Sequence, residues 1–385
     1  MSDPQMRRPF TVFPLPRGVV ILLGVAAGVV VLGGMRAIAG IIAPIFFALC
    51  MTVTVYPVRT WLRRKGTPGW LATLVVVLGV IIGLVGLVVA LIVGAARFAT
   101  IIPQYATQMQ STIDSFKSWL AGLGIGTAQI EQMASGVSSG KVLDFVGGVL
   151  DSMLSLLSLL LFIVALIIFM GLDGAAFPSR MERVRDGRGA AIDALTSFAL
   201  GTRKYFAVST VFGGIVAVLD GIALVILDIP GPVLWALLAF VTNYIPNIGF
   251  LIGLIPVAIL ALLTGGVGKM VTVIVVYCVL NAVIQSVIQP KYVGDSVGLT
   301  TTVSFLSLIV WAWVLGPIGA ILAVPMTLLV KSVLVDVDPD ARWLQLFLGD
   351  EPVHKPKKVK KRRGSQADPP GGALAADAAS PAVEA

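Results

Sequence analysis

The chain has 385 residues, of which 57% are hydrophobic and only 12% carry a charged side chain. A soluble globular protein carries ~25% charged residues, so this composition excludes an ordinary soluble enzyme or binding module. The fold class is therefore an all-α polytopic membrane protein. The formal net charge of +8 does not indicate nucleic-acid binding, because seven positive charges lie within residues 355–363, beyond the last apolar segment. A basic cluster at that place predicts contact with anionic lipid.

The N-terminus is predicted to be retained as a membrane anchor. Residues 1–17 are short and basic, and an apolar run follows at 18–34. This layout resembles a signal peptide, but a second apolar run at 38–56 follows almost directly. Cleavage would leave another span at the new terminus, so retention as a first transmembrane helix is favoured.

The loop at 57–68 sets the predicted orientation of the chain. Its basic residues are Arg59, Arg63, Arg64 and Lys65, and it contains no acidic residue. The positive-inside rule places such a loop in the cytoplasm, and with it the N-terminus. A third span at 69–97 follows, so residues 18–98 are predicted to hold transmembrane helices 1–3.

Residues 99–151 are much less apolar and are predicted to form an extracytoplasmic amphipathic segment. Between Ile102 and Leu123 the apolar positions step by three or four, which is typical of one face of a helix. The segment could be an interfacial helix, an oligomer contact or a lid. The sequence leaves these three roles open.

The next two spans are predicted at 152–172 and 205–227, with a largely basic cytoplasmic loop between them. Asp220 is the one carboxylate deep within the second of these spans. An ionisable group inside a span is costly, and by default it predicts a functional site, here a candidate for proton or cation coupling. The alternative is that Asp220 lies near the outer interface, since Asp228 and a Pro-Gly-Pro turn follow within twelve residues.

Span six, at 233–263, is predicted to be interrupted. As a straight helix its 31 residues would be about 46 Å long, well beyond the ~30 Å hydrocarbon core. Proline and glycine oppose a straight helix there, and a break at membrane depth survives only where protein or a water-filled cavity satisfies the backbone. The pathway or hinge residues predicted here are Asn243, Pro246, Asn247, Gly249, Gly253 and Pro256. The alternative is a simple proline kink whose two glycines form a helix contact.

Span seven, at 270–288, places polar amides at four-residue steps and hence on one helix face. The predicted pathway residues are Asn281, Gln285 and Gln289, followed directly by Pro290 and Lys291. Such a stripe can line a pathway or bond neighbouring helices, and we favour the pathway.

Span eight, at 304–335, is again overlong and is interrupted at Gly316 and Pro317 and once more at Pro325. A pair of Gly/Pro-interrupted spans is the best sequence pointer to the binding site of a transporter. We therefore place transmembrane helices 4–8 at 152–335, with the transport core at 205–335. Residues 336–385 are predicted to be a basic, disordered cytoplasmic tail.

Three motifs resemble the autoinducer-2 exporter-like family of bacterial membrane proteins. They are Asn-Tyr-Ile-Pro-Asn-Ile-Gly at 243–249, Gln-Pro-Lys-Tyr-Val-Gly-Asp-Ser-Val-Gly-Leu at 289–299, and Trp-Val-Leu-Gly-Pro-Ile-Gly-Ala-Ile-Leu-Ala-Val-Pro at 313–325. The resemblance implies about eight helices and a location in the cytoplasmic membrane. For some members it also implies export of autoinducer-2 or exchange of sodium for protons. Many relatives have an acidic residue in span seven, where this chain has amides and Ser286.

Enzymatic chemistry and cofactors are not expected. The one histidine is His354, in the tail, so no histidine-based triad or metal site can form within the membrane domain. Cys50 and Cys278 both lie in apolar stretches and are interpreted as core residues without a disulfide.

Two functions from different classes remain. The first is a secondary transporter for a small polar solute such as an autoinducer-2-like signal, or an exchanger of a monovalent cation for protons. The second is a non-transporting scaffold that binds partner proteins through residues 99–151 and the basic tail. The predicted location is the bacterial plasma membrane, with both termini inside. The predicted partners are the lipid bilayer, anionic lipid at the tail and, because of glycine stripes, a further copy of the chain. The sequence does not give the substrate, the direction of transport, its coupling or the oligomeric state. It also leaves open whether the interrupted spans are kinks or re-entrant hairpins.

Overall fold

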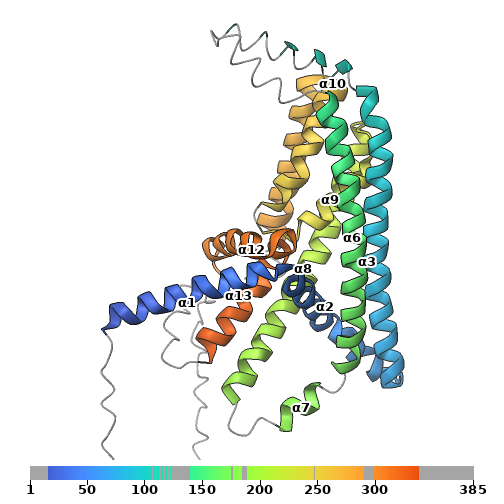
Figure 1. Cartoon of the computed structure of the whole chain (residues 1–385). Coiled ribbons are helices and arrows are strands. Elements are labelled where there is room, and N and C mark those ends of the chain that lie inside the picture. Colours follow the sequence, from blue (N-terminus) through green and yellow to red (C-terminus); the bar gives the residue numbers. More distant parts are fainter. Residues whose placement is uncertain are drawn as a thin grey trace, which may run out of the picture. The chain divides into compact units, whose positions relative to one another are not determined.

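A computed structural model describes most of the membrane domain. The described residues are 16–105, scattered positions between 107 and 122, and then 139–174, 177–183, 189–246, 248–289 and 299–337. Within these ranges every regular element is a helix (Figure 1). Seven of the described helices are long and apolar enough to cross a membrane, which confirms the predicted all-α polytopic fold of about eight spans.

The structure describes thirteen helical elements along the chain. In chain order they are α1 (Arg17–Ala37), α2 (Ala39–Arg64), α3 (Gly69–Ile101), the 3₁₀-helix η1 (Ile102–Tyr105), α6 (Ser139–Asp173), α7 (Phe177–Arg183), α8 (Gly189–Ile226), α9 (Pro232–Thr242), α10 (Gly249–Asn281), the π-helix η2 (Ala282–Ile288), α12 (Thr301–Ile321), α13 (Ala323–Lys331) and the π-helix η3 (Ser332–Asp336).

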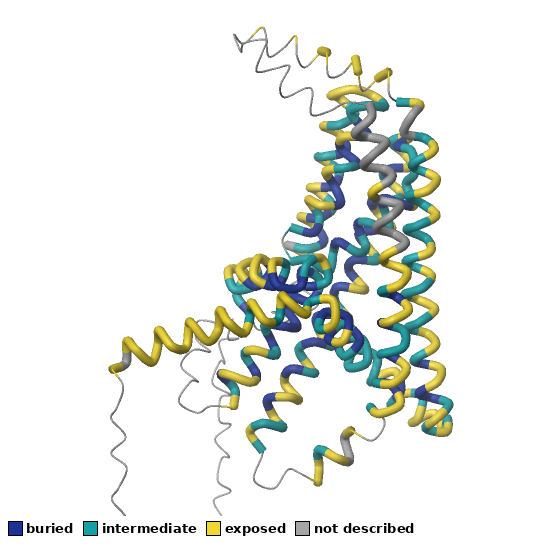
Figure 2. Tube along the Cα trace, in the orientation of Figure 1, coloured by how far each residue is buried: buried dark blue, intermediate teal, exposed yellow. Residues whose placement is uncertain are grey.

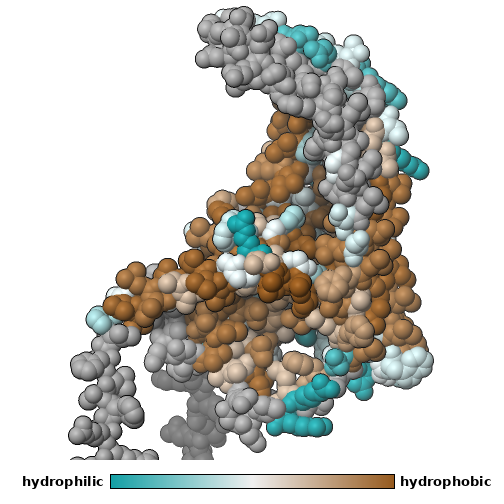
Figure 3. Space-filling model, viewed as in Figure 1, coloured by the Kyte–Doolittle hydropathy of each residue, from teal (hydrophilic) through white to brown (hydrophobic). Residues whose placement is uncertain are grey.

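The spanning helices expose their apolar side chains rather than burying them all. In the most apolar window of α1 none of the residues is buried, and in α3 only 6% are. A helix that is apolar all round and yet exposed is stable only where the surrounding solvent is lipid. Figure 3 shows the resulting hydrophobic surface, with hydrophilic residues gathered near α7.

Helices α3 and α6 lie side by side as two long arms, with α2 packed against both (Figure 1). Their contact is close at Gly171, where an added Cβ atom would lie 2.5 Å from a methyl carbon of Val77. Ala48, Ile163 and Ile167 form the small core between α2 and α6. The end of α2, the start of α3 and α7 then define the basic end of the domain, which carries Arg63, Arg64, Lys65, Arg180 and Arg183.

Helix α9 runs back along α8 but stops halfway. The Cβ of Ala236 lies opposite Gly221 of α8, and Asn243, just after α9, lies opposite Gly213. Later residues of α9 therefore face earlier residues of α8, so the two helices are antiparallel. With 11 residues, α9 is only about 16 Å long. The chain consequently breaks beside the middle of the 38-residue helix α8.

At this break the chain folds back instead of continuing as one kinked span. An added Cβ atom at Gly249 would collide with the carbonyl oxygen of Thr242, and one at Gly253 would lie 3.6 Å from the Cα of Ala239. Residues 239 and 253 would be about 21 Å apart along a straight helix, so their contact requires an antiparallel pair. The predicted break at Pro246 is thus present, and of the forms that the sequence left open, a kink or a hairpin, residues 233–263 adopt the hairpin.

Helix α10 contains a second reversal at Gly266, where φ is 73° and ψ is −168°. This backbone region is essentially restricted to glycine. The reversal brings the end of α10 back to its start, because Gln285 hydrogen-bonds to Asn243. A straight α10 of 33 residues would separate these groups by about 50 Å. Its second arm corresponds to the predicted span seven.

Helix α12 reverses in the same way at Gly316, with φ 70° and ψ −151°. The Ser307 hydroxyl donates to the carbonyl oxygen of Ala323 at 2.7 Å, and the indole N–H of Trp311 donates to Thr327 at 3.0 Å. Each pair is 16 residues apart, which would be about 24 Å in a straight helix. The interruption predicted within 304–335 at Gly316 and Pro317 is therefore present. Of the two forms that the sequence left open, a kink or a hairpin, the chain adopts the hairpin, with its turn at these two residues.

Candidate functional site

The break between α9 and α10 is fixed to α8 by polar contacts. The side-chain amide of Asn243 donates to the carbonyl oxygen of Ser209 at 3.1 Å. The phenol of Tyr205 donates to the carbonyl oxygen of Tyr244, whose own hydroxyl lies 2.7 Å from that of Thr210. The Tyr205 contact satisfies a backbone carbonyl group at the break, where a broken helix leaves such groups without partners, and the other two contacts tie the break to α8. The sequence analysis missed the part played by Tyr205 and Thr210, which look like ordinary helix residues.

Three amide side chains meet at this break. The Nε2 group of Gln285 donates to Oδ1 of Asn243 at 3.2 Å and to Oδ1 of Asn281 at 2.9 Å. Asn281 in turn donates to the carbonyl oxygen of Tyr277 at 2.9 Å. Asn281 is buried and the other two are half-buried. We call Asn243, Asn281 and Gln285 the amide cluster.

The amide cluster lies where three elements of different geometry meet. Asn243 follows the end of α9, Asn281 ends α10, and Gln285 lies within the π-helix η2. Figure 2 shows buried residues gathered along the faces where α8, α9 and α10 meet. A π-helical turn inside an α-helix is uncommon and is frequently found at functional sites. No pattern in the sequence predicted it.

Asp220 is deeply buried, although it lies only six residues before the end of α8. Its side chain is 1% exposed, as is that of Tyr277 on α10. Within the described part of the chain, neither the two carboxylate oxygens nor the Tyr277 hydroxyl has a hydrogen-bond partner. An ionised carboxylate in such surroundings costs several kcal/mol unless a proton or cation compensates it.

The other predicted residues are distributed as follows. Pro246 lies in the break, Gly249 and Gly253 pack α10 against α9, and Pro256 lies within the first arm of α10. Gln289 is half-buried and directly follows η2. Gly316 and Pro317 form the turn of the second hairpin rather than part of the amide cluster. Asn247, Pro290 and Lys291 lie outside the described residues.

The amides of the cluster are paired with one another and with the backbone in this structure. Cavities of about 720 and 780 Å³ in the described ranges are lined by other residues. The larger one is an apolar groove between α3, α8 and α9. The amides hydrogen-bond to one another and to the backbone. A bound solute would therefore have to break these hydrogen bonds and form new ones with the same amides. No group of three or more metal-ligating side chains occurs among the described residues.

Comparison with known proteins connects this architecture to one family. The family model described as AI-2E family transporter matches residues 20–337, which include all of the reversals and the amide cluster. This chain belongs to the AI-2E transporter family. It is therefore a multi-pass membrane transport protein.

Individual members of the AI-2E transporter family match over nearly their whole length. "Putative transport protein YhhT" of Escherichia coli K12 is 30% identical over 336 residues, covering 87% of this chain and 96% of the relative. The "AI-2 transport protein TqsA" of the same strain is 29% identical over 320 residues, covering 82% and 91%. A "Putative transport protein" of Haemophilus influenzae is 30% identical over 343 residues, covering 86% and 96%.

Proposed function

We propose that this member of the AI-2E family is a secondary transporter for a small polar solute of the autoinducer-2 type, or an exchanger of a monovalent cation for protons. The amide cluster carries this proposal. It places amide donors and acceptors beside the middle of α8, where lipid offers no hydrogen bond. Amides both donate and accept, so they suit a neutral solute with several hydroxyl groups.

In this proposal the chain reversals act as hinges about which α10 moves. The break before α10 and the turn at Gly266 leave the first arm of α10 joined to its neighbours by turns at both ends. Turns of this kind are the places where hinge motion changes backbone angles. Rocking about these turns that also moves the second arm of α10, which leads into η2, would part Gln285 from Asn243 on the α8 side and expose both to a solute. The basic end of the domain would face the cytoplasm, following the positive-inside rule.

Asp220 is the proposed coupling residue. Its carboxyl group and the hydroxyl of Tyr277 are both buried, and neither has a hydrogen-bond partner within the described ranges. Binding of a proton or a monovalent cation would relieve the cost of the buried charge. Helix α8 also contacts the amide cluster through Ser209, 11 residues earlier and about 16 Å away along the helix. A change at Asp220 could thus reach the cluster through a single rigid helix.

The proposal is tested by flux into proteoliposomes of the purified protein, with autoinducer-2 and sodium assayed separately, with and without an imposed proton gradient. We expect one of the two to be transported and to respond to the gradient. In Asp220→Asn we expect this response to fall at least about ten-fold, because an amide cannot exchange the proton.

Asp228→Asn is the matched control, since this residue lies in the turn after α8 and not in the core. An Asp220→Asn protein with an unchanged gradient response would contradict the coupling role. Absence of flux of both solutes from folded wild-type protein would contradict the cargo assignment.

A further inference from the structure

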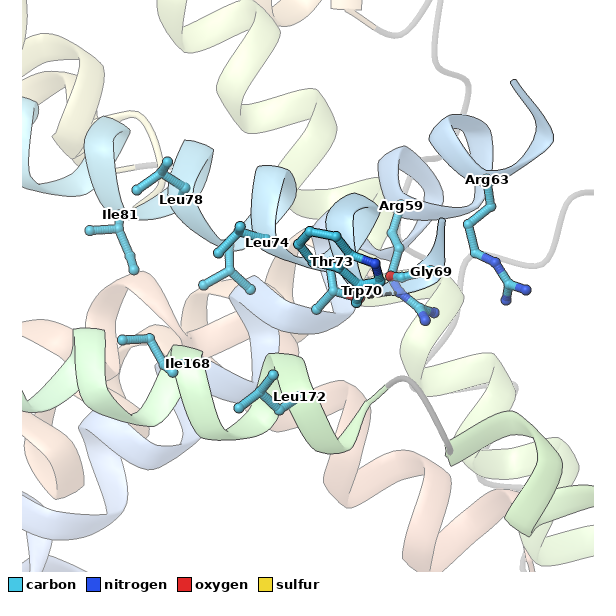
Figure 4. A pocket seen from close by; sticks show the side chains of 11 residues that line it. Arg59, Arg63, Gly69, Trp70, Thr73, Leu74, Leu78, Ile81, Ile168 and Leu172 are labelled. Atoms are coloured by element: carbon cyan, nitrogen blue, oxygen red, sulfur yellow. Dashed lines mark hydrogen bonds between the residues drawn. The ribbon is translucent and has the colours of Figure 1, made fainter. Parts of the chain in front are cut away.

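A pocket distinct from the amide cluster opens between α3 and α6 at the basic end of the domain. Its volume is about 720 Å³. Figure 4 shows two guanidinium groups, those of Arg59 and Arg63, at one end, and aliphatic side chains of α3 and α6 along the rest. Among these aliphatic residues are Leu74, Leu78, Ile168 and Leu172. The pocket is therefore cationic at its head and apolar along its length.

Arg59 is nearly buried, and its guanidinium makes one hydrogen bond to a residue that lines the pocket. It is only 8% exposed, and its Nε group donates to the hydroxyl of Thr73 at 2.7 Å. A guanidinium has five N–H donors, and this contact uses one of them. None of the described residues lining the pocket carries a carboxylate. A nearly buried cation in a pocket whose described lining residues carry no carboxylate favours an anion from outside the chain.

The dimensions of the pocket match one leaflet of a bilayer. Its lining extends along α3 from Gly69 to Ile81. Twelve residues of helix correspond to about 18 Å. Half of the ~30 Å hydrocarbon core is about 15 Å. Trp70 is 70% exposed beside the cationic end, and tryptophan is enriched at the level of lipid headgroups. The cationic end thus lies where a headgroup would lie.

We propose that this pocket binds an anionic phospholipid, with the headgroup phosphate at Arg59 and Arg63 and one acyl chain in the apolar groove between α3 and α6. Charge selects the ligand, because the lining offers cations and no anion. The apolar groove between α3, α8 and α9 has a similar volume but no charged lining residue, so it gives no comparable selection.

The test is native mass spectrometry of the full-length protein in mild detergent, titrated with phosphatidylglycerol, phosphatidylcholine or glycerol 3-phosphate. We expect phosphatidylglycerol to be retained in preference to the other two. Arg63→Gln should weaken this retention about five-fold, in line with the contribution of one basic residue beside anionic lipid. Because Arg59→Gln alters a buried residue and could impair folding, Leu78→Trp provides a second variant that blocks the apolar groove without changing charge.

Two controls test whether basic residues outside the pocket account for lipid retention. Arg180→Gln removes one exposed charge from α7 at the same end of the domain, outside the pocket, and should leave retention unchanged. Deletion of residues 352–385 removes the basic cluster that is itself predicted to contact anionic lipid, and the loss of retention caused by Arg63→Gln should persist in this shortened chain. Equal retention by wild type and Arg63→Gln, or equal binding of the two phospholipids, would overturn the proposal. So would binding of glycerol 3-phosphate as tight as that of phosphatidylglycerol, since it would indicate a site for free phosphate esters.

Discussion

Gln285→Ala is expected to reduce solute flux at least about ten-fold in proteoliposomes that contain equal amounts of folded protein. Gln285 donates to both Asn243 and Asn281, so its removal leaves two carbonyl oxygens without their donor. Each lost contact is worth about 1–3 kcal/mol, and about 1.4 kcal/mol changes a rate ten-fold. The same substitution removes a donor that the solute is proposed to use.

Gln108→Ala is the matched control for this prediction. Gln108 is an exposed amide outside the cluster, and its replacement should leave flux unchanged. If Gln285→Ala transported as well as wild type, the amides would only bond neighbouring helices. The scaffold function, in which residues 99–151 and the tail bind partner proteins, would then gain support.

Gly249→Ala is expected to destabilise the domain by about 3 kcal/mol and to abolish transport. The added Cβ atom would collide with the backbone carbonyl oxygen of Thr242, and backbone cannot move aside as a flexible side chain can. The fold-back of α10 onto α9 would then be displaced, and with it Asn243. The midpoint of thermal unfolding in detergent should fall by about 5 °C or more.

Gly214→Ala is the control for this change, since an added Cβ atom at Gly214 meets nothing within 4 Å. That variant should unfold at the wild-type temperature or slightly above it, because alanine favours helix over glycine. A Gly249→Ala protein with wild-type stability and flux would show that the tight approach of α9 to α10 is not needed.

The sequence predicted where the helices are interrupted but not what the chain does there. Proline and glycine around Pro246 and Gly316 mark a break through local backbone chemistry alone. Whether the chain kinks or reverses depends on partners distant in sequence, such as Ser307 with Ala323. Helix length was the misleading signal, since 31 or 32 residues fit one tilted span as readily as a hairpin.

The candidate site was predictable only where it depends on residues close together in the sequence. The four-residue spacing of Asn281 and Gln285 placed them on one face, and they are indeed hydrogen-bonded to each other. Their contact with Asn243 spans 42 residues. The reversal at Gly266 falls between the predicted spans six and seven, but the sequence did not predict that the fold-back before α10 and this reversal together bring Gln285 to Asn243. The burial of Asp220 likewise depends on packing by α10, whereas local sequence showed only that the end of a helix was near.

Cysteine accessibility at Ser209 tests most directly whether the amide cluster lines the solute pathway. Ser209→Cys would be made in a background without Cys50 and Cys278, leaving all three amides in place. Val211, two residues away on the same helix, is 58% exposed on the outer surface and serves as the control. We predict that a small hydrophilic thiol reagent modifies Ser209→Cys during transport and that the transported solute slows this reaction, while Val211→Cys stays unreactive in lipid. Modification of Ser209→Cys no faster than that of Val211→Cys, with or without solute, would contradict a pathway at the amide cluster.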